Sequence, residues 1–294
     1  MTSVRQHFVP QGYLRGFADE GDPARSHIWV YDKQAGRAPR RKAIRSIAWA
    51  PAYYAQESED GSDDLDTVER GLATTIDNRI PQIISKIKPQ VGRLVELSEE
   101  DRAALSFFVG LSLTRVPSFR DGINEMHKRV VEIELSYQLQ KDPVLSQISE
   151  DHGIDVSVKP WVSLRPMIQL ALQIAQSSLQ KNWQFFVPPE QVPLVTSDNP
   201  VVFSGGAAGL VGNIGPAHPG AELVMNLRKD LALVCTPRRG YPSMSVFTLT
   251  TADAWKFNRG VVRAARQRVF SSQRSETLDA FVKKYVGEEQ RIVV

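Results

Sequence analysis

The sequence predicts an α+β fold in which a helical middle packs on a mostly antiparallel sheet formed largely by the C-terminal third. Two observations support this class. Between residues 64 and 181, apolar residues recur every three or four positions, as they do on one face of a helix. After Asn182 the pattern changes to short apolar runs bounded by Pro, Gly and Asn, which indicate strands. Runs of helices followed by runs of strands are typical of α+β proteins.

The first fifty residues contain short elements. A helix of one or two turns is expected to begin near Pro10, because Pro is well tolerated in the first turn, and to stop at Gly16. The β-branched and aromatic residues of His27–Asp32 predict a strand. A second short extended segment is expected at Ile44–Ala48.

Four amphipathic segments make up the predicted helical middle. The first, Asp64–Ile87, is expected to be kinked or divided by Pro81. Ser98, followed three residues later by Asp101, resembles a capping arrangement that opens the second. This second helix is expected to run through Leu105 up to Arg115, and the remaining two are predicted at Ser118–Gln140 and Ser163–Lys181.

The last third is predicted to form one largely antiparallel sheet followed by two helices. The expected strands are Trp183–Val187, Leu194–Thr196, Val201–Phe203, Glu222–Asn226, Leu231–Thr236 and Met244–Leu249. The expected helices are Ala252–Arg268 and Glu276–Val286, the second stopped by Gly287.

We expect one domain over residues 1–294, because the lone N-terminal strand can join the late sheet. Its predicted parts are a helical part at about 64–181, a sheet-rich part at about 182–250 and C-terminal helices at about 252–287.

Composition narrows the class of protein. The chain has 294 residues, and its 36 basic and 33 acidic side chains give a net charge of +3, too small by itself to indicate a polyanionic partner. The single cysteine favours a reducing, cytoplasmic setting. No secretory leader and no run of eighteen apolar residues is present, so we expect no membrane association. Nothing in the sequence specifies a cofactor or an oligomeric state.

Strict motifs for metal binding and nucleophilic catalysis are absent. The five histidines are far apart and no HExxH occurs, so no metal ligand is predicted, although a magnesium site assembled from carboxylates stays open. The serines near residue 200 lack the G-x-S-x-G elbow, and Cys235 lies in an apolar run that predicts a core position. The glycine-rich stretch 205–215 lacks the P-loop pattern and predicts a mobile surface loop, with a lid as the alternative.

Three arginines near the C-terminus suggest a binding face. Arg259, Arg263 and Arg266 are spaced i, i+4 and i+7, which places them on one face of the predicted helix. Arginines without acidic partners on their own helix are suited to a phosphate-bearing ligand. Ion pairs with acids elsewhere in the fold are the alternative.

The most distinctive segment is Thr196-Ser197-Asp198-Asn199-Pro200. Asp198 and Asn199 interrupt two apolar runs, and both can hydrogen-bond to their own backbone two residues on. A turn would explain this pattern. The alternative is that Asp198, at the end of a buried strand, presents a carboxylate to a pocket.

Two motifs together resemble a known family. His7-Phe8-Val9-Pro10-x-x-Tyr13-Leu14-x-x-Phe17 and Thr196-Ser197-Asp198-Asn199-Pro200 are similar to those of an uncharacterised, mainly bacterial family of a domain of unknown function. The family pattern also includes residues like Tyr54, Glu69, the Arg115-x-Pro117 step and Asn258, in the same order. Val116 stands where many members have Thr. The resemblance spans nearly the whole chain and implies one long domain, but it brings no established activity.

The polar motif residues suggest hydrolytic or phosphoryl-transfer chemistry. His7 would move a proton near pH 7, Asp198 or Glu69 would orient it or bind a metal, and Arg115 would neutralise a developing negative charge. Tyr54, Asn199, Asn258 and the three arginines complete the candidate site as substrate-binding residues.

Our first hypothesis is a hydrolase or nuclease-like enzyme acting on a nucleic acid or nucleotide, as a toxin or defence component. The alternative is a non-enzymatic binding or protein-interaction module whose motif residues are structural. For the enzyme, His7 and Asp198 are expected within one water's reach, and Arg115 is expected to face the same cavity.

Overall fold

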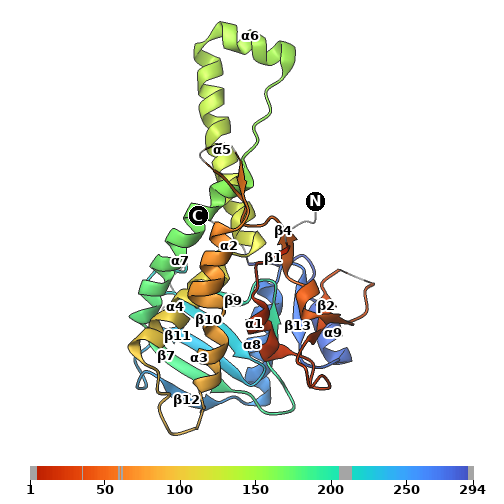
Figure 1. Ribbon diagram of the computed structural model, residues 1–294, viewed down its shortest axis with the longest axis vertical. Coiled ribbons are helices and arrows are strands. Elements are labelled where there is room, and N and C mark those ends of the chain that lie inside the picture. Colours follow the sequence, from red (N-terminus) through yellow and green to blue (C-terminus); the bar gives the residue numbers. More distant parts are fainter. Residues whose placement is uncertain (1–4, 35, 59, 61, 205–213, 291–294) are drawn as a thin grey trace.

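The fold is α+β, as the sequence predicts. The computed structural model describes residues 5–34, 36–58, 60, 62–204 and 214–290. Its two largest sheets are assembled mainly from the C-terminal third, and the middle of the chain is helical (Figure 1).

The larger sheet has five strands in the order β12-β7-β11-β10-β9. Neighbouring strands are antiparallel except β12 and β7, which are parallel. The strand bounds are Asn182–Val187 for β7, Val201–Ser204 for β9, Glu222–Arg228 for β10, Leu231–Thr236 for β11 and Ser245–Thr248 for β12.

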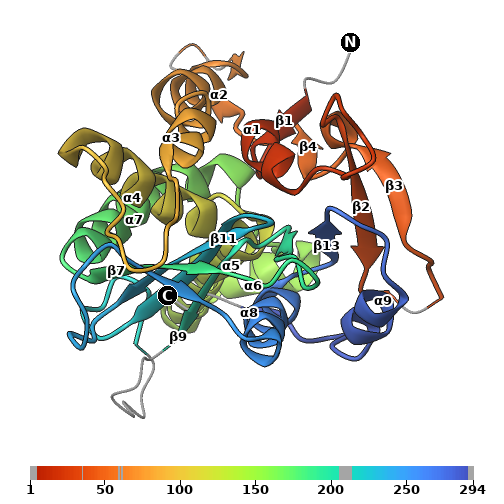
Figure 2. The same cartoon turned by 90° about the horizontal axis from the view of Figure 1, so that it is seen from below.

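Helices cover both faces of this sheet, so every residue of β11 is buried (Figure 2). Helices α4 (Glu99–Thr114) and α7 (Leu164–Leu179) lie on one side, and α8 (Thr251–Ala264) packs on the other. A Cβ on Gly110 of α4 would lie 2.3 Å from a backbone oxygen of α7. The absence of a side chain there lets the two helices approach closely.

The second sheet corrects the expectation of a single late sheet. Its order is β3-β2-β13-β8, and all its neighbours are antiparallel. The bounds are His27–Asp32 for β2, Arg40–Ala43 for β3, Thr196–Ser197 for β8 and Arg268–Ser271 for β13. The N-terminal strand therefore pairs with strands from the last third, but in a sheet of its own. Helix α9 (Glu276–Lys283) packs against it.

The predicted helix Ala252–Arg268 is wrong at its C-terminal end, because α8 stops at Ala264 and β13 follows. The buried ammonium of Lys33 donates to the carbonyl of Val262 in the last turn of α8 at 2.9 Å and to that of the C-cap residue Ala265 at 2.8 Å. Asp198 accepts the backbone N–H groups of residues 266–268. These contacts, made by side chains remote in sequence, provide the helix end with partners.

The middle helices are confirmed. Residues 64–87 divide into α2 (Thr67–Leu72), a π-turn (Ala73–Asp77) and α3 (Ile80–Lys86), with Pro81 in the first turn of α3. The Ser98 hydroxyl caps α4 by accepting from the N–H of Asp101 at 3.1 Å. Helix α5 (Pro117–Lys141) continues into α6 (Pro143–His152), which the sequence analysis missed, and the two project from the body (Figure 1).

The N-terminal residues form short elements. Strand β1 (Arg5–His7) pairs with β4 (Trp49–Pro51), and α1 (Gln11–Leu14) continues as a 3₁₀ turn over 15–17. The extended segment predicted at 44–48 is wrong, since residues 44–46 form a 3₁₀ turn. A further small pair joins β5 (Gln56–Glu57) and β6 (Asp63–Asp64).

Tyr13 joins the two sequence motifs. Its buried hydroxyl lies 2.8 Å from Thr196 Oγ1 and donates to the carbonyl of Asn226 at 2.5 Å. The N-terminal motif therefore packs directly against the strand that precedes Asp198.

Two sequence expectations concern the surface of the chain. In the part that the structure describes, no helix combines the length and the apolarity needed to cross a membrane. The expected glycine-rich loop at 205–215 falls mainly on residues 205–213, which lie outside the described residues.

The single-domain prediction can be tested by dividing the chain. A fragment of residues 1–181 lacks β13, which pairs with β2, and β8 beyond it in the same sheet, and the complementary fragment lacks β2 and β3. We therefore expect neither fragment to give a cooperative thermal transition by circular dichroism, while the whole chain gives one. Two stable fragments from limited proteolysis near residue 182 would instead indicate two domains.

Candidate functional site

Five polar side chains from separate segments meet beside the N-terminal strand. They are His7 in β1, Tyr54 after β4, Glu69 in α2, Asp77 at the end of the π-turn and Arg115 at the C-cap of α4. Hydrogen bonds join Tyr54 to His7 and Arg115 to Asp77. In addition, the pKa values of His7, Tyr54, Glu69 and Arg115 are each shifted by the charge of at least one other member. We call this group the polar cluster.

Arg115 is the buried base of the cluster, with 0% of its side chain exposed. Its Nη1 donates to both carboxylate oxygens of Asp77, at 2.9 and 3.1 Å, and its guanidinium lies 5.4 Å from the ring centroid of Phe108. Burial disfavours the charge, but Asp77 outweighs this effect and the pKa of Arg115 is raised. Its Nε and Nη2 have no hydrogen-bond partner among the described residues.

The π-turn places Asp77 in the cluster. The N–H of Asn78 bonds to the carbonyl of Ala73 at 3.2 Å, five residues back. In a regular α-helix, Asp77 would point about 80° away from Glu69, eight residues earlier. The wider π-turn rotates the chain less per residue, which brings Asp77 back toward the face of Glu69. π-Turns of this kind are frequent at functional sites.

Buried polar contacts on β1 fix the position of His7. The Tyr54 hydroxyl donates to the carbonyl of His7 at 3.1 Å, and the buried Gln6 accepts from the N–H of Tyr54 at 2.6 Å and donates to the carbonyl of Leu65. Burial lowers the pKa of His7. Its Nε2 is buried and has no partner among the described residues.

Glu69 has a strongly shifted pKa. Burial and the nearby charge of Asp77 raise it to about 7, although Arg115 opposes this shift. One carboxylate oxygen, Oε2, is buried and without a partner in the described part of the chain. At neutral pH, Glu69 is therefore divided between its protonated and ionised forms.

The members of the cluster differ in burial. His7 and Glu69 are partly exposed, and so is Asp77, whereas Arg115 and Tyr54 are buried beneath them. Over the described residues, no group of three or more His, Cys, Asp or Glu side chains has the geometry to hold a metal ion.

Asp198 lies in a different network. Its Oδ1 accepts from the N–H of Arg266 at 2.9 Å, and its Oδ2 accepts from Gln267 and Arg268 at 2.8 and 3.0 Å. Burial raises its pKa, and the three donors oppose that shift. Neither a hydrogen bond nor an ion pair joins Asp198 to His7, both of which are described. Both carboxylate oxygens of Asp198 are taken up by backbone N–H groups, so it makes no direct contact with His7.

Asn199 and Asn258 also contact the backbone. Asn199 Nδ2 donates to the carbonyl of Ala264 at 3.1 Å. Asn258 Oδ1 accepts from the N–H of Val195 at 3.0 Å, and its Nδ2 donates to the carbonyl of Pro193 at 3.0 Å. These amides tie α8 to the segment around β8, which is the structural alternative considered for this motif.

The comparisons were made with protein families, curated proteins and solved structures. The family described as "Protein of unknown function (DUF4238)" matches residues 5–275. The chain belongs to this family. No curated protein and no solved structure matches it. The matched range includes all five residues of the polar cluster.

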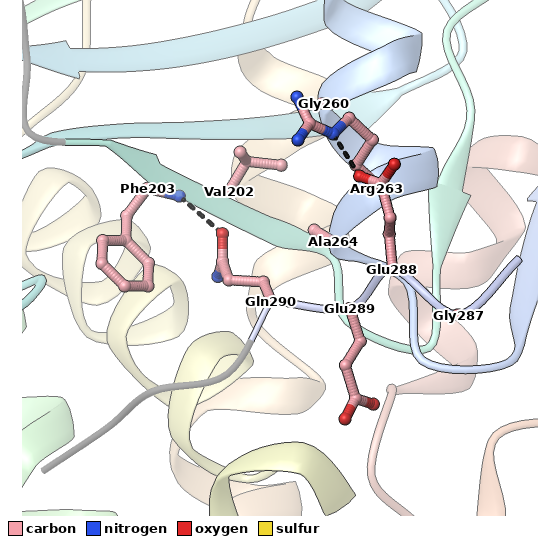
Figure 3. Close-up of a pocket in the computed structure, with 9 residues that line it drawn as sticks. All are labelled: Val202, Phe203, Gly260, Arg263, Ala264, Gly287, Glu288, Glu289 and Gln290. Atoms are coloured by element: carbon pink, nitrogen blue, oxygen red, sulfur yellow. Dashed lines mark hydrogen bonds and ion pairs between the residues drawn. The ribbon is translucent and has the colours of Figure 1, made fainter. Parts of the chain in front are cut away.

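The arginine face expected in this DUF4238 protein is not formed. Because α8 ends at Ala264, Arg266 lies beyond the helix, where it pairs with Asp121 at 2.5 Å. Arg263 lines a cavity of about 480 Å³ beside the C-terminal segment but pairs with Glu288 at 2.6 Å (Figure 3). Arg259 is exposed. Ion pairs with acids elsewhere, the alternative raised from the sequence, therefore account for two of the three.

Sequence reasoning selected four of the five residues of the DUF4238 polar cluster and missed Asp77. The missing signal is the π-turn, since Asp77 falls within an ordinary amphipathic pattern and has no motif around it. Cys235 is buried and burial raises its pKa to about 12, which confirms its predicted core position.

Replacing Asp198 should destabilise the fold. An amide cannot accept all three N–H groups, so Asp198→Asn should lower the free energy of unfolding by roughly 2–4 kcal/mol. Urea denaturation measures this, with the exposed Asp155→Asn as control. An unchanged unfolding midpoint for Asp198→Asn would contradict the structural role.

Glu69 should make stability depend on pH. The folded-state pKa of about 7 exceeds the ordinary glutamate value of 4.5, so between these pH values the folded protein binds more protons than the unfolded chain. The stabilising contribution of protonated Glu69 is therefore complete below about pH 4.5 and is lost as the pH rises through 7.

Glu69→Gln should thus be more stable relative to the wild type at pH 8 than at pH 5. Urea denaturation at the two pH values measures the difference, with Glu125→Gln, whose position lies outside the cluster, as the control. An equal effect of Glu69→Gln at both pH values would show that the pKa is not raised.

Proposed function

We propose that this protein is a hydrolase that cleaves a phosphodiester bond in a nucleotide, with the polar cluster as its active site. The observation that carries the proposal is the fully buried Arg115, whose Nε and Nη2 have no partner among the described residues, in a cluster where His7 Nε2 and Glu69 Oε2 also lack one there. Buried polar atoms are almost always hydrogen-bonded, so four such atoms in one cluster indicate a site for a polar ligand.

The unpartnered edge of Arg115 defines the chemistry of the ligand. Nε and Nη2 form the planar fork that binds two oxygens of a phosphate or carboxylate in parallel. Asp77 occupies only Nη1, so it fixes the guanidinium while leaving this fork for an oxyanion. In a site shielded from water, such donors stabilise the negative charge that develops in a transition state.

The pKa shifts of His7 and Glu69 assign the acid and the base. The lowered pKa keeps His7 neutral at pH 7, and its Nε2 can accept a proton. The raised pKa of about 7 leaves Glu69 partly protonated, so it can donate one. Groups whose pKa values are moved in opposite directions in one site are typical of general acid–base pairs.

A balanced reaction follows from these roles. His7 Nε2 takes a proton from water as the water oxygen forms a bond to phosphorus. The bond from phosphorus to the leaving oxygen breaks, and Glu69 gives that oxygen its proton. Arg115 holds the two non-bridging oxygens throughout. The proton on His7 then returns to Glu69 through solvent, which restores both groups.

The charge of the cluster favours a diester over a monoester. With His7 neutral and Glu69 protonated, Arg115 and Asp77 cancel, so the site suits a singly charged phosphodiester better than a dianion. The depth of Arg115 favours a small substrate or a chain end. A long nucleic acid is less suited, because Arg263 and Arg266 are paired with acids.

Hydrolysis of bis(4-nitrophenyl) phosphate, followed by nitrophenolate release, tests the proposal. We expect turnover by the wild type and a loss of about 10²–10⁴-fold in kcat for His7→Gln and Glu69→Gln, the usual contribution of a general acid or base. The exposed His152→Gln is the matched control and should retain activity. The monoester 4-nitrophenyl phosphate should react more slowly.

Thermal melts separate this function from the structural alternative. At pH 7 the two active-site variants should melt close to the wild type, because His7 Nε2 and Glu69 Oε2 have no hydrogen-bond partner to lose among the described residues. If instead the wild type hydrolyses neither ester nor the dinucleotide phosphodiesters, and both variants lose several kcal/mol of stability, the cluster is structural and the protein is a binding module.

A further inference from the structure

A helical arm stands out from the body of the protein (Figure 1). It consists of α5 from Asn124 onward, α6 and the chain that returns as far as Lys159. Helix α5 has 25 residues, yet it buries only Phe119, Arg120 and Ile123, all near its start. Helix α6 buries none. The arm is therefore a long surface with few internal contacts.

The arm carries an uncovered apolar stripe. Val130, Ile133 and Tyr137 are 60, 71 and 50% exposed. Their spacing continues that of Ile123 and Met126, which pack into the core at the base of the same helix. Together the five residues follow an a, d, a, d, a heptad pattern. Because Ile123 and Met126 lie against the chain's own core, the part of this seam that another helix can contact is the exposed a, d, a set of Val130, Ile133 and Tyr137.

The base of the arm is firmly held. The buried Arg120 donates to the carbonyl of Pro160 and the hydroxyl of Ser163, both at 2.8 Å, and its guanidinium lies 4.2 Å from the ring centroid of Tyr53. The two ends of the arm are thus bound to each other and to the body. The stripe is presented on a fixed helix, which reduces the entropy lost on binding.

We propose that the arm pairs in parallel with the arm of a second copy of this chain. In the heptad frame, Arg129 occupies a g position and Glu134 the following e position. In a parallel pair, g contacts the e residue five positions on in the partner helix. Arg129 of each copy therefore meets Glu134 of the other, and twofold symmetry makes two such ion pairs.

This self-complementarity argues for a second copy as the occupant. The stripe and its flanking charges satisfy each other when two identical helices lie in register. Exposed apolar residues gathered in a stripe mark interaction surfaces, whereas isolated ones need no explanation. The inference does not rest on the proposed reaction.

Sedimentation and multi-angle light scattering test the pairing. We expect the wild type to have twice the 32.8 kDa mass of one chain at micromolar concentration. Ile133→Glu should raise the dissociation constant by more than about tenfold. Val131→Glu is the matched control, because Val131 is 48% exposed on the same helix but lies off the stripe. A monomeric wild type overturns the proposal, and so does a dimer that Ile133→Glu leaves intact.

Charge reversal and cross-linking test the parallel register. Arg129→Glu should weaken the dimer, and Arg129→Glu with Glu134→Arg should restore it. Ile133→Cys should form a disulfide between copies on oxidation, because equivalent d positions face each other in a parallel pair. Gln138→Cys, on another face, should not. Cys235, the natural cysteine, is buried. A dimer with the opposite cross-linking pattern contradicts the parallel arrangement.

Discussion

Arg115 carries a positive charge that is fully buried, so other groups of the protein must balance it. Leaving a buried charge without a partner costs several kcal/mol, so its environment is constrained from several sides. Asp77 pairs with one edge of the guanidinium, the π-turn places Asp77 within reach, and Phe108 lies against the cation. What these partners leave unmatched is the fork of Nε and Nη2. In the proposed function, a substrate oxyanion completes the balance.

A second polar network, formed by residues outside the polar cluster, stabilises the end of α8 and the turn that follows it. Lys33 accounts for the end of α8, and Asp198 holds the turn into β13. Every polar oxygen of the Asp198 carboxylate has a backbone partner, unlike the side-chain atoms of His7 and Glu69. The N-terminal motif joins the two networks. It carries His7 of the polar cluster and, a few residues later, Tyr13, whose hydroxyl bonds to Thr196 next to the Asp198 segment. The Asp198 carboxylate is therefore satisfied by the backbone, whereas the polar cluster gathers four buried atoms that have no partner among the described residues.

The arm and the site share a boundary. Tyr53 lies against Arg120 at the base of the arm, and its hydroxyl donates to the carbonyl of Arg115 at 2.8 Å. Tyr53 also lies next to Tyr54 in the sequence, and their rings contact each other. The base of the arm therefore lies directly beside the residues of the proposed active site.

The sequence by itself determined the fold class, the main helices and four of the five cluster residues. Periodicity and caps such as Ser98 are local properties, and local patterns are readable without a structure. The end of α8, the division into two sheets and the position of Asp77 depend on contacts between residues far apart in the chain. Lys33 lies more than two hundred residues before the helix end that it completes, and no spacing rule links them. The motif residues were recognisable, but whether each was satisfied or left open was decided only when the tertiary structure gave it neighbours, because hydrogen-bond partners are a property of packing.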